Sequence, residues 1–255
     1  MKRNVRSVAA DSDLRRILAR KPLLAFDYDG TLAPITAHPE QTITPPAIHA
    51  ALLALSERAP VVILTGRSCD DTRKRLHLPA ARIIGNHGAE GLPQTDTTAF
   101  HAQVQHWDAL IRQHFAADIQ RAGLHLENKG YSLSLHTRLA TDAALARQLL
   151  RRVRSALPAN AHCFPGKCIL NIVPRDAPDK ASALHQLTVH DTDLPGRPAI
   201  YLGDDLNDEV VFERAPAHWM TVRVGPHRHS AARYYARRQQ DVLWFLLRAL
   251  AHLQH

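Results

Sequence analysis

The sequence is poor in cysteine, which limits the covalent bonds that can hold it together. Its 255 residues contain three cysteines, Cys69, Cys163 and Cys168, and an odd number cannot all pair within one chain. Cys163 and Cys168 also lack the second cysteine pair or the histidine spacing of a zinc site. A disulfide framework and a structural zinc site are therefore excluded, and we interpret the three residues as reduced, buried thiols.

Long apolar runs are missing as well. No segment approaches the roughly 18 consecutive apolar residues of a membrane-spanning helix, and no apolar core of a secretory leader follows the basic first 22 residues. Internal repeats and low-complexity segments are also lacking. The simplest expectation is a cytoplasmic protein without a membrane partner, and we expect it to be a monomer.

What remains is a composition typical of globular proteins, with 45% hydrophobic and 22% charged residues. A chain of this length buries roughly 70–75% of its extended surface, which suits one large domain or a core domain with a smaller companion. Its 32 basic and 24 acidic residues leave a net charge of +8. This excess indicates an anionic partner, and nucleic acid, a membrane surface and a phosphorylated metabolite all fit.

Short apolar segments alternate with a helical pattern, which is typical of a parallel sheet covered by helices on both faces. Strands are predicted at 23–26, 61–64, 83–85 and 199–203, each bounded by a turn signal. A helix is predicted at 46–59, where proline opens a run with helical apolar spacing. The expected core is therefore an α/β, Rossmann-like parallel sheet.

The middle of the chain follows a different pattern. Two helices and one strand with alternating polar and apolar residues are predicted there, at 101–122, 141–156 and 131–136. Alternation indicates a sheet with one solvated face. We therefore expect an inserted α+β domain at 98–174 and a core formed by 1–97 and 175–255. An apolar helix expected at 241–253 closes that core.

Polar residues gather directly after the predicted strands, where ligands bind in open parallel sheets. Asp27 and Asp29 leave the strand at 23–26 two residues apart, so one can attack a substrate while the other moves a proton. Carboxylates this close repel each other unless a cation holds them. An ordinary Asp-Gly turn is the alternative interpretation of this segment taken alone.

A second acidic cluster follows the strand at 199–203. Asp204, Asp205, Asp208 and Glu209 place four carboxylates within six residues, and oxygen-only ligands of this kind suit Mg²⁺. The alternative is a solvated acidic helix start, but two such clusters after two strands make coincidence a poor explanation. We therefore predict one crevice where both clusters meet around Mg²⁺.

Four segments resemble, in the same order, the motifs of the haloacid dehalogenase (HAD) superfamily of phosphatases. They are 27–32, 64–67, the segment 178–184 that contains Lys180, and 203–209. Within that superfamily the chain is most similar to the trehalose-6-phosphate phosphatases. The matching segments are 27–34, 85–90, 127–138, 166–167 and 203–212.

The resemblance implies a HAD core that hydrolyses trehalose 6-phosphate through an aspartyl-phosphate intermediate, with Mg²⁺ as cofactor. Asp27 would be the nucleophile and Asp29 the general acid and base. Thr65 would hydrogen-bond the transferring phosphoryl group, and Lys180 would offset its charge. The implied metal ligands are the Asp27 carboxylate, the Asp29 backbone carbonyl and Asp204, with Asp205 and Asp208 nearby.

The resemblance also implies that the inserted domain is a cap that closes over the sugar phosphate. The residues that match the family's contacts to the distal sugar and the phosphate are Glu127, Lys129, Arg138 and Lys167. Asn171 stands where the family usually has a glutamate, which replaces a charged acceptor by a neutral one. Arg67 completes the expected substrate-binding set, although its position also suits a helix start. We expect His87 to hold its loop rather than act in catalysis.

Alternatives remain at each level. A solvated sheet face with exchangeable ion pairs is the alternative for the cap residues, and Asn171 leaves room for another sugar phosphate or a glycosyl phosphoglycerate as substrate. A nucleic-acid-binding protein would use the positive charge but leaves the aspartate clusters unexplained, so we expect no nucleic-acid partner. Its basic patch would consist of Arg223, Arg228, Arg233, Arg237 and Arg238.

Overall fold

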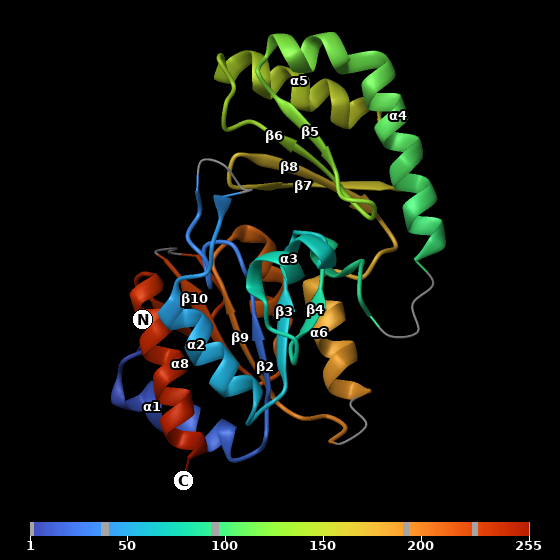
Figure 1. The fold of residues 1–255 in the computed structure, drawn as a ribbon. Helices are drawn as coiled ribbons and strands as arrows, with labels where there is room; N and C mark the ends of the chain where they lie inside the picture. Colours follow the sequence, from blue (N-terminus) through green and yellow to red (C-terminus); the bar gives the residue numbers. More distant parts are fainter. Residues whose placement is uncertain (1–2, 37–40, 93–96, 191–193, 226–228, 255) are drawn as a thin grey trace. The chain divides into compact units, whose positions relative to one another are not determined.

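The computed structural model describes residues 3–36, 41–92, 97–190, 194–225 and 229–254 (Figure 1). Contacts between residues divide the chain into two units, Met1–Gly91 with Asp179–His255, and Leu92–Pro178. The first unit is built on a parallel sheet and the second on an antiparallel sheet, and each has its own hydrophobic core. The expected fold class, an α/β core with an α+β insertion, is therefore confirmed.

A parallel sheet organises the first unit. Its strands follow the order β1-β11-β10-β9-β2-β3-β4, and neighbours pair in parallel throughout the described residues. The strands are β1 (Arg3–Asn4), β2 (Leu23–Phe26), β3 (Val61–Leu64), β4 (Arg82–Ile84), β9 (Ala199–Gly203), β10 (Met220–Val224) and β11 (Tyr234–Ala236). The chain order reverses between β2 and β9, and such a reversal opens a crevice at the carboxyl ends of the two strands.

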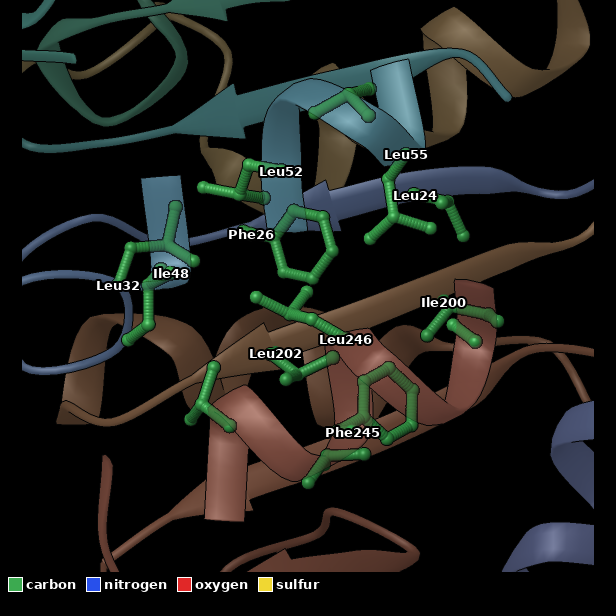
Figure 2. Close-up of a cluster of buried hydrophobic side chains, with 14 of the residues drawn as sticks. Leu24, Phe26, Leu32, Ile48, Leu52, Leu55, Ile200, Leu202, Phe245 and Leu246 are labelled. Carbon is green, nitrogen blue, oxygen red and sulfur yellow. The ribbon is translucent and has the colours of Figure 1, made fainter. Parts of the chain in front are cut away.

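Helices α1 (Val8–Leu18), α2 (Pro46–Ser56) and α8 (Gln239–Leu253) cover one face of this sheet. Alternate residues of β2 and β9 point toward them, so Phe26 and Leu202 lie among the side chains of α2 and α8 in Figure 2. Leu52 and Phe245 come from these two helices and are fully buried. Because burying one such side chain contributes roughly 1.5–3 kcal/mol, this cluster holds β2 and β9 firmly in place.

The remaining residues of β9 point to the opposite face. Tyr201 packs there against Phe212 of α7 (Glu209–Arg214), with ring centroids 5.8 Å apart. The α6 helix (Lys180–Val189) contacts α7. The described part of this unit also contains α3 (Cys69–Leu76) and two short helical segments, η2 (Asn86–Gly88) and η3 (Leu206–Asp208).

The second unit packs two helices on one face of a sheet with the order β5-β6-β8-β7. Its elements are α4 (Thr98–Arg121), β5 (His125–Asn128), β6 (Leu133–His136), α5 (Ala143–Ala156), β7 (Ala161–Gly166) and β8 (Ile169–Pro174). Leu133 and Leu135 of β6 lie in the core with Trp107 of α4 and Leu149 of α5. Because side chains alternate along a strand, Ser134 points to the other face.

Most of the predicted elements are confirmed, with shifts at their ends. The strands expected at 23–26, 61–64 and 199–203 have these bounds, and the helix expected at 101–122 begins three residues earlier. Among the described residues, no helix is long and apolar enough to cross a membrane.

The interpretation of the cysteines as buried thiols is correct only for Cys69. Cys163 is half-buried and Cys168 is exposed, and all three are free. Cys168 lies in the turn between β7 and β8 with a left-handed φ of 58°. Turns run over the surface because their backbone groups need water, so the position of Cys168 exposes its thiol.

Candidate active site at the carboxyl ends of the parallel strands

Asp27 lies at the carboxyl end of β2, in the crevice that the strand order creates. Its backbone N–H donates to the carbonyl of Leu202 at 2.9 Å, which continues the pairing with β9 by one residue. The residue is only 5% exposed. The core packing of β2 and β9 therefore fixes the position of this carboxylate.

Lys180 joins Asp27 to Asp208 across the crevice. Its Nζ donates to Asp27 Oδ1 at 2.6 Å and to Asp208 Oδ1 at 2.7 Å. Lys180 opens α6, whose start is set by the Asp179 side chain accepting from the Ser182 N–H at 2.8 Å. This N-cap places a buried ammonium, 1% exposed, between two carboxylates.

The charges of this cluster depend on one another. Burial raises the pKa of Asp27 well above its usual range, although Lys180 acts to lower it. Burial also acts to lower the pKa of Lys180, but Asp208 and Asp27 raise it above its ordinary value. Lys180 therefore stays protonated, and a second cation beside Asp27 would favour the ionised carboxylate.

Asp208 is fully occupied by hydrogen bonds. Its Oδ1 accepts from Lys180 Nζ and from Tyr201 Oη at 2.6 Å, and its Oδ2 accepts from the N–H groups of Asp204 and Asp205 at 2.8 and 2.9 Å. A carboxylate has about four acceptor positions. Burial acts to raise the pKa of Asp208, but Lys180 and these hydrogen bonds lower it, so Asp208 holds the loop as an anion.

A divalent cation fits the carboxylates at this end of the sheet. Oxygens of Asp27, Asp204 and Asp208 lie within 4.8 Å of one another, and all three residues are buried. An all-carboxylate donor set suits a hard cation such as Mg²⁺. Because Asp208 already accepts four hydrogen bonds, Asp27 and Asp204 are the better-placed side-chain ligands. The Asp205 side chain instead caps η3.

Gly30 makes room for the Asp204 carboxylate. A Cβ atom on Gly30 would lie 2.0 Å from Asp204 Oδ2, and the φ of Gly30 is +84°. Only glycine satisfies both the close approach and the left-handed backbone. The Asp-Gly turn after β2 is thus shaped around a carboxylate from β9.

Arg67 holds the second aspartate of the first motif. Its Nε and Nη2 donate to Asp29 Oδ2 and Oδ1, both at 2.7 Å, and its Nη1 donates to Asp71 Oδ2 at 2.7 Å. The guanidinium also lies 5.6 Å from the centroid of the Tyr28 ring. Burial acts to lower the pKa of Arg67, but the two carboxylates raise it above its ordinary value. The group expected to contact substrate therefore engages Asp29 and Asp71.

Thr65 follows β3 and is buried beside the same crevice. Its Oγ1 accepts from the Arg67 N–H at 3.1 Å, and its carbonyl accepts from the His87 N–H at 2.9 Å. The His87 ring packs on Gly66, where a Cβ would lie 2.4 Å from Cε1. These contacts hold His87 against the Thr65–Gly66 segment, and its expected structural role stays a prediction.

In the second unit, three of the expected substrate-binding residues, Glu127, Lys129 and Asn171, lie on the sheet face opposite the helices. Glu127 Oε2 lies 2.8 Å from His136 Nε2 and 3.8 Å from Lys129 Nζ. Glu127, Ser134 and Asn171 occupy one row across three strands. Ser134 Oγ donates to Asn171 Oδ1 at 3.1 Å, and both residues are buried.

The other two expected residues lie in turns. Arg138 is two residues beyond β6, and Lys167 lies in the turn between β7 and β8. The Thr137 N–H donates to the Cys168 carbonyl at 2.9 Å, which brings these two turns together. Arg138 is half-buried and Lys167 is exposed.

Sequence reasoning missed two contributors to the site. Asp71 lies four residues after Arg67, and this helical spacing is a signal that the pair could meet. Tyr201 sits inside an apolar strand, where a tyrosine is indistinguishable from an ordinary core residue. The sequence therefore carried a usable signal for Asp71 but none for Tyr201.

The arginines of the alternative nucleic-acid patch do not form one free surface. Arg223 is buried and donates to the Asp205 carbonyl and to Glu209 Oε1. Arg233 donates to the carbonyls of Ala217 and Pro216. Arg228 lies outside the described residues, and Arg233, Arg237 and Arg238 are exposed.

A parallel sheet that reverses at β2 and β9, charged motifs at its strand ends and an inserted antiparallel unit define a fold of the HAD class. The model of the trehalose-phosphatase family matches residues 25–240. The chain belongs to this family.

Two curated relatives are similar to most of this chain. A trehalose-phosphate phosphatase of Mycobacterium tuberculosis (strain H37Rv) is 28% identical over 222 residues, covering 84% of this chain and 56% of that protein. An uncharacterized glycosyl hydrolase of the same strain is 28% identical over 256 residues, covering 95% of this chain and 19% of that protein. The chain thus spans just over half the length of the first relative and about a fifth of the length of the second.

A solved structure supports the fold. The C-terminal domain of a Candida albicans trehalose-6-phosphate phosphatase superposes with a TM-score of 0.79 at 20% identity, over 98% of both chains.

Proposed function

We propose that the chain is a Mg²⁺-dependent phosphatase that hydrolyses trehalose 6-phosphate to trehalose and phosphate. Family membership and the trehalose-phosphate phosphatase relatives support the substrate class. The contact that carries the proposal is the buried pair of Asp27 and Lys180 beside Asp204, because it joins a nucleophile to the positive charge that attack on a phosphate dianion needs.

Asp27 and Asp29 divide the chemistry between them. An oxygen of Asp27 attacks phosphorus, the bond between phosphorus and the sugar oxygen breaks, and Asp29 donates a proton to that oxygen. Asp29 then takes a proton from water, whose oxygen attacks the phosphorus of the aspartyl phosphate. Phosphate leaves and the Asp27 carboxylate is restored.

The charge of the phosphoryl group is offset by several groups. Lys180 provides a fixed ammonium, and Thr65 would hydrogen-bond the phosphoryl oxygens. Mg²⁺ would be held by the carboxylates of Asp27 and Asp204 and the Asp29 backbone carbonyl, with Asp205 and Asp208 nearby. When bound, it supplies the Lewis acidity that offsets the charge of the phosphoryl oxygens.

We assign substrate selection to a cap domain at 98–174. Glu127 and Lys129 present opposite charges on one face of its sheet, and Arg138 and Lys167 lie in adjacent turns. Carboxylate and ammonium groups so placed can hydrogen-bond sugar hydroxyls, and the basic turns suit a phosphate. A cap would also exclude water from the aspartyl-phosphate intermediate.

Asn171 favours a second candidate substrate. Ser134 donates to its carbonyl oxygen, so the amide N–H groups of Asn171 are the larger part of what it can offer a ligand. A site with donors in place of acceptors suits another sugar phosphate or a glycosyl phosphoglycerate.

Phosphate release from a panel of phosphorylated sugars tests the proposal. With Mg²⁺, trehalose 6-phosphate should have the highest kcat/KM, and Asp27→Asn should lower it by at least about 10³-fold while the circular dichroism spectrum stays unchanged. A tenfold preference, about 1.4 kcal/mol, for another substrate would favour the second candidate. Full activity of Asp27→Asn would overturn the mechanism.

A further inference from the structure

A cavity of about 580 Å³ opens in the first unit away from the strand-end acids. It is lined by Asn4, Arg6, Arg237, Arg238 and Asp241. Pockets for small molecules measure roughly 300–1,000 Å³, so its size suits a metabolite. Arg237 and Arg238 follow β11, which lies three strands from β2 in the sheet order. At the usual strand spacing, the cavity is therefore about 14 Å from Asp27 at the end of β2.

The lining of this cavity is strongly basic. Asp241 is the one acidic residue among the described residues that line it. It is only 6% exposed and accepts from Arg6 Nε at 2.7 Å and from the Arg237 N–H at 2.8 Å. The guanidinium groups of Arg237 and Arg238 are exposed, and neither pairs with a carboxylate among the described residues. The described lining therefore holds three arginines and one aspartate that is already paired with Arg6, which leaves a net positive charge.

Arg6 is held in place before any ligand arrives. Its guanidinium lies 5.6 Å from the centroid of the Trp244 ring while its Nε contacts Asp241. The backbone beside it is fixed because the Val5 N–H donates to the Tyr235 carbonyl at 2.8 Å. A cation already fixed by an aromatic ring and a carboxylate loses little freedom on binding an anion.

We propose that this cavity binds a small phosphate-bearing anion at a site separate from the strand-end acids. Arginine suits this ligand because its planar fork donates two parallel hydrogen bonds to a phosphate group. The Asn4 side chain adds an amide donor at the same rim. The cavity thus offers an anion the guanidinium of Arg6, which is already held in place, and the exposed side chains of Arg237 and Arg238.

Calorimetric titration with inorganic pyrophosphate, in EDTA and 50 mM NaCl, tests this site. Arg237→Ser/Arg238→Ser should raise the dissociation constant at least tenfold. Arg151→Ser/Arg154→Ser removes two exposed arginines from α5 and should change it less than twofold. Hydrogen–deuterium exchange should show protection by pyrophosphate at 234–242 in the wild-type protein.

Three results would overturn the proposal. One is equal pyrophosphate affinity of the two double variants, and another is no binding by the wild-type protein at millimolar pyrophosphate. The third is salt-sensitive binding of duplex DNA that is lost in Arg237→Ser/Arg238→Ser while pyrophosphate has no effect, which would assign the arginines to nucleic acid. Matching thermal midpoints of the variants exclude misfolding as the cause.

Discussion

Arg67 donates one hydrogen bond to each carboxylate oxygen of Asp29, both at 2.7 Å. The guanidinium is itself fixed by Asp71 and by the Tyr28 ring, so the aspartate is held in one orientation. A general acid and base must stand in a defined position relative to the reacting oxygen. In the proposed phosphatase, we therefore expect Arg67 to act through Asp29 rather than on the substrate.

This relationship predicts a change in kcat rather than in KM. Arg67→Met should lower kcat about 10–100-fold, because a carboxylate displaced by about 1 Å costs that much, and should alter KM less than about threefold. Arg67→Lys should recover part of the loss. Arg75→Met, which removes another partner of Asp71, serves as the control and should change kcat little. A raised KM with unchanged kcat in Arg67→Met would instead assign Arg67 to substrate binding.

Removing the ammonium between Asp27 and Asp208 should destabilise the fold. Lys180→Met leaves two buried carboxylates without their shared cation, which costs about 3–5 kcal/mol of unfolding free energy. Urea denaturation at pH 7 measures this loss. Lys74→Met, on an exposed lysine of α3, should change it by less than about 0.5 kcal/mol.

The double variant Lys180→Met/Asp27→Asn separates charge from packing. Because Asp27→Asn removes one of the two unpaired charges, the double variant should be more stable than Lys180→Met alone. If the two single losses simply add, the interaction between Lys180 and Asp27 contributes nothing to stability.

Gly30→Ala should disturb the cation site specifically. The new methyl group would meet Asp204 Oδ2, whereas Gly225→Ala places a methyl group at a similar φ of +82° with no atom of the described residues within 4 Å. Both variants carry the strain of a left-handed alanine, about 1–2 kcal/mol, so their difference isolates the clash. Gly30→Ala alone should weaken Mg²⁺ binding in calorimetry; equal Mg²⁺ affinity in the two variants would contradict this role of Gly30.

The contact between α1 and α8 should make stability depend on acid pH. Hydrogen bonds from Arg248, and secondarily from His252, hold the pKa of Asp11 well below its ordinary value of 3.8 despite some burial. Because the pKa of Asp11 is lower in the folded protein than in the unfolded chain, ionised Asp11 stabilises the fold above pH 3.8. This stabilisation is lost progressively as the pH falls below that value.

Comparing Asp11→Asn with the wild-type protein by urea denaturation measures this effect. The variant should lose about 1 kcal/mol at pH 7 and progressively less below pH 3.8. Asp70→Asn breaks the exposed pair with Arg73 and should have almost no effect at either pH. A pH-independent loss in Asp11→Asn would show that its contribution is not electrostatic.

Much of the core could be predicted because its signals are local. The strands at 23–26 and 61–64 are short apolar runs ended by turn residues. Such runs are too short for a helix and are typical of buried strands. β1 has two residues and exists only because it pairs with β11. β10 contains the buried Arg223, whose charge is offset by Glu209 and which also donates to the Asp205 carbonyl, so the sequence of β10 does not look like a core strand.

The site was predictable only as far as its motifs reach. Asp27 and Asp204 could be placed together because each follows a strand at the same edge of the sheet. Lys180 could be added only through the resemblance to the HAD motifs, because a lysine at a helix start is usually a surface residue. The contact of Arg67 with Asp29 depends on side-chain geometry that spacing does not encode. Tyr201, which donates a hydrogen bond to Asp208, is concealed by its apolar neighbours in the sequence.

The partnership of Asp27 and Lys180 spans 153 residues of sequence, with the whole antiparallel unit lying between them. Closing so distant a contact is slow compared with local helix formation. During synthesis from the amino terminus, the first aspartate leaves the ribosome long before its ammonium partner. The pair of Asp27 and Lys180 can therefore form only after the antiparallel unit has been synthesised, and a nascent chain that ends before Lys180 leaves the Asp27 carboxylate without its ammonium partner.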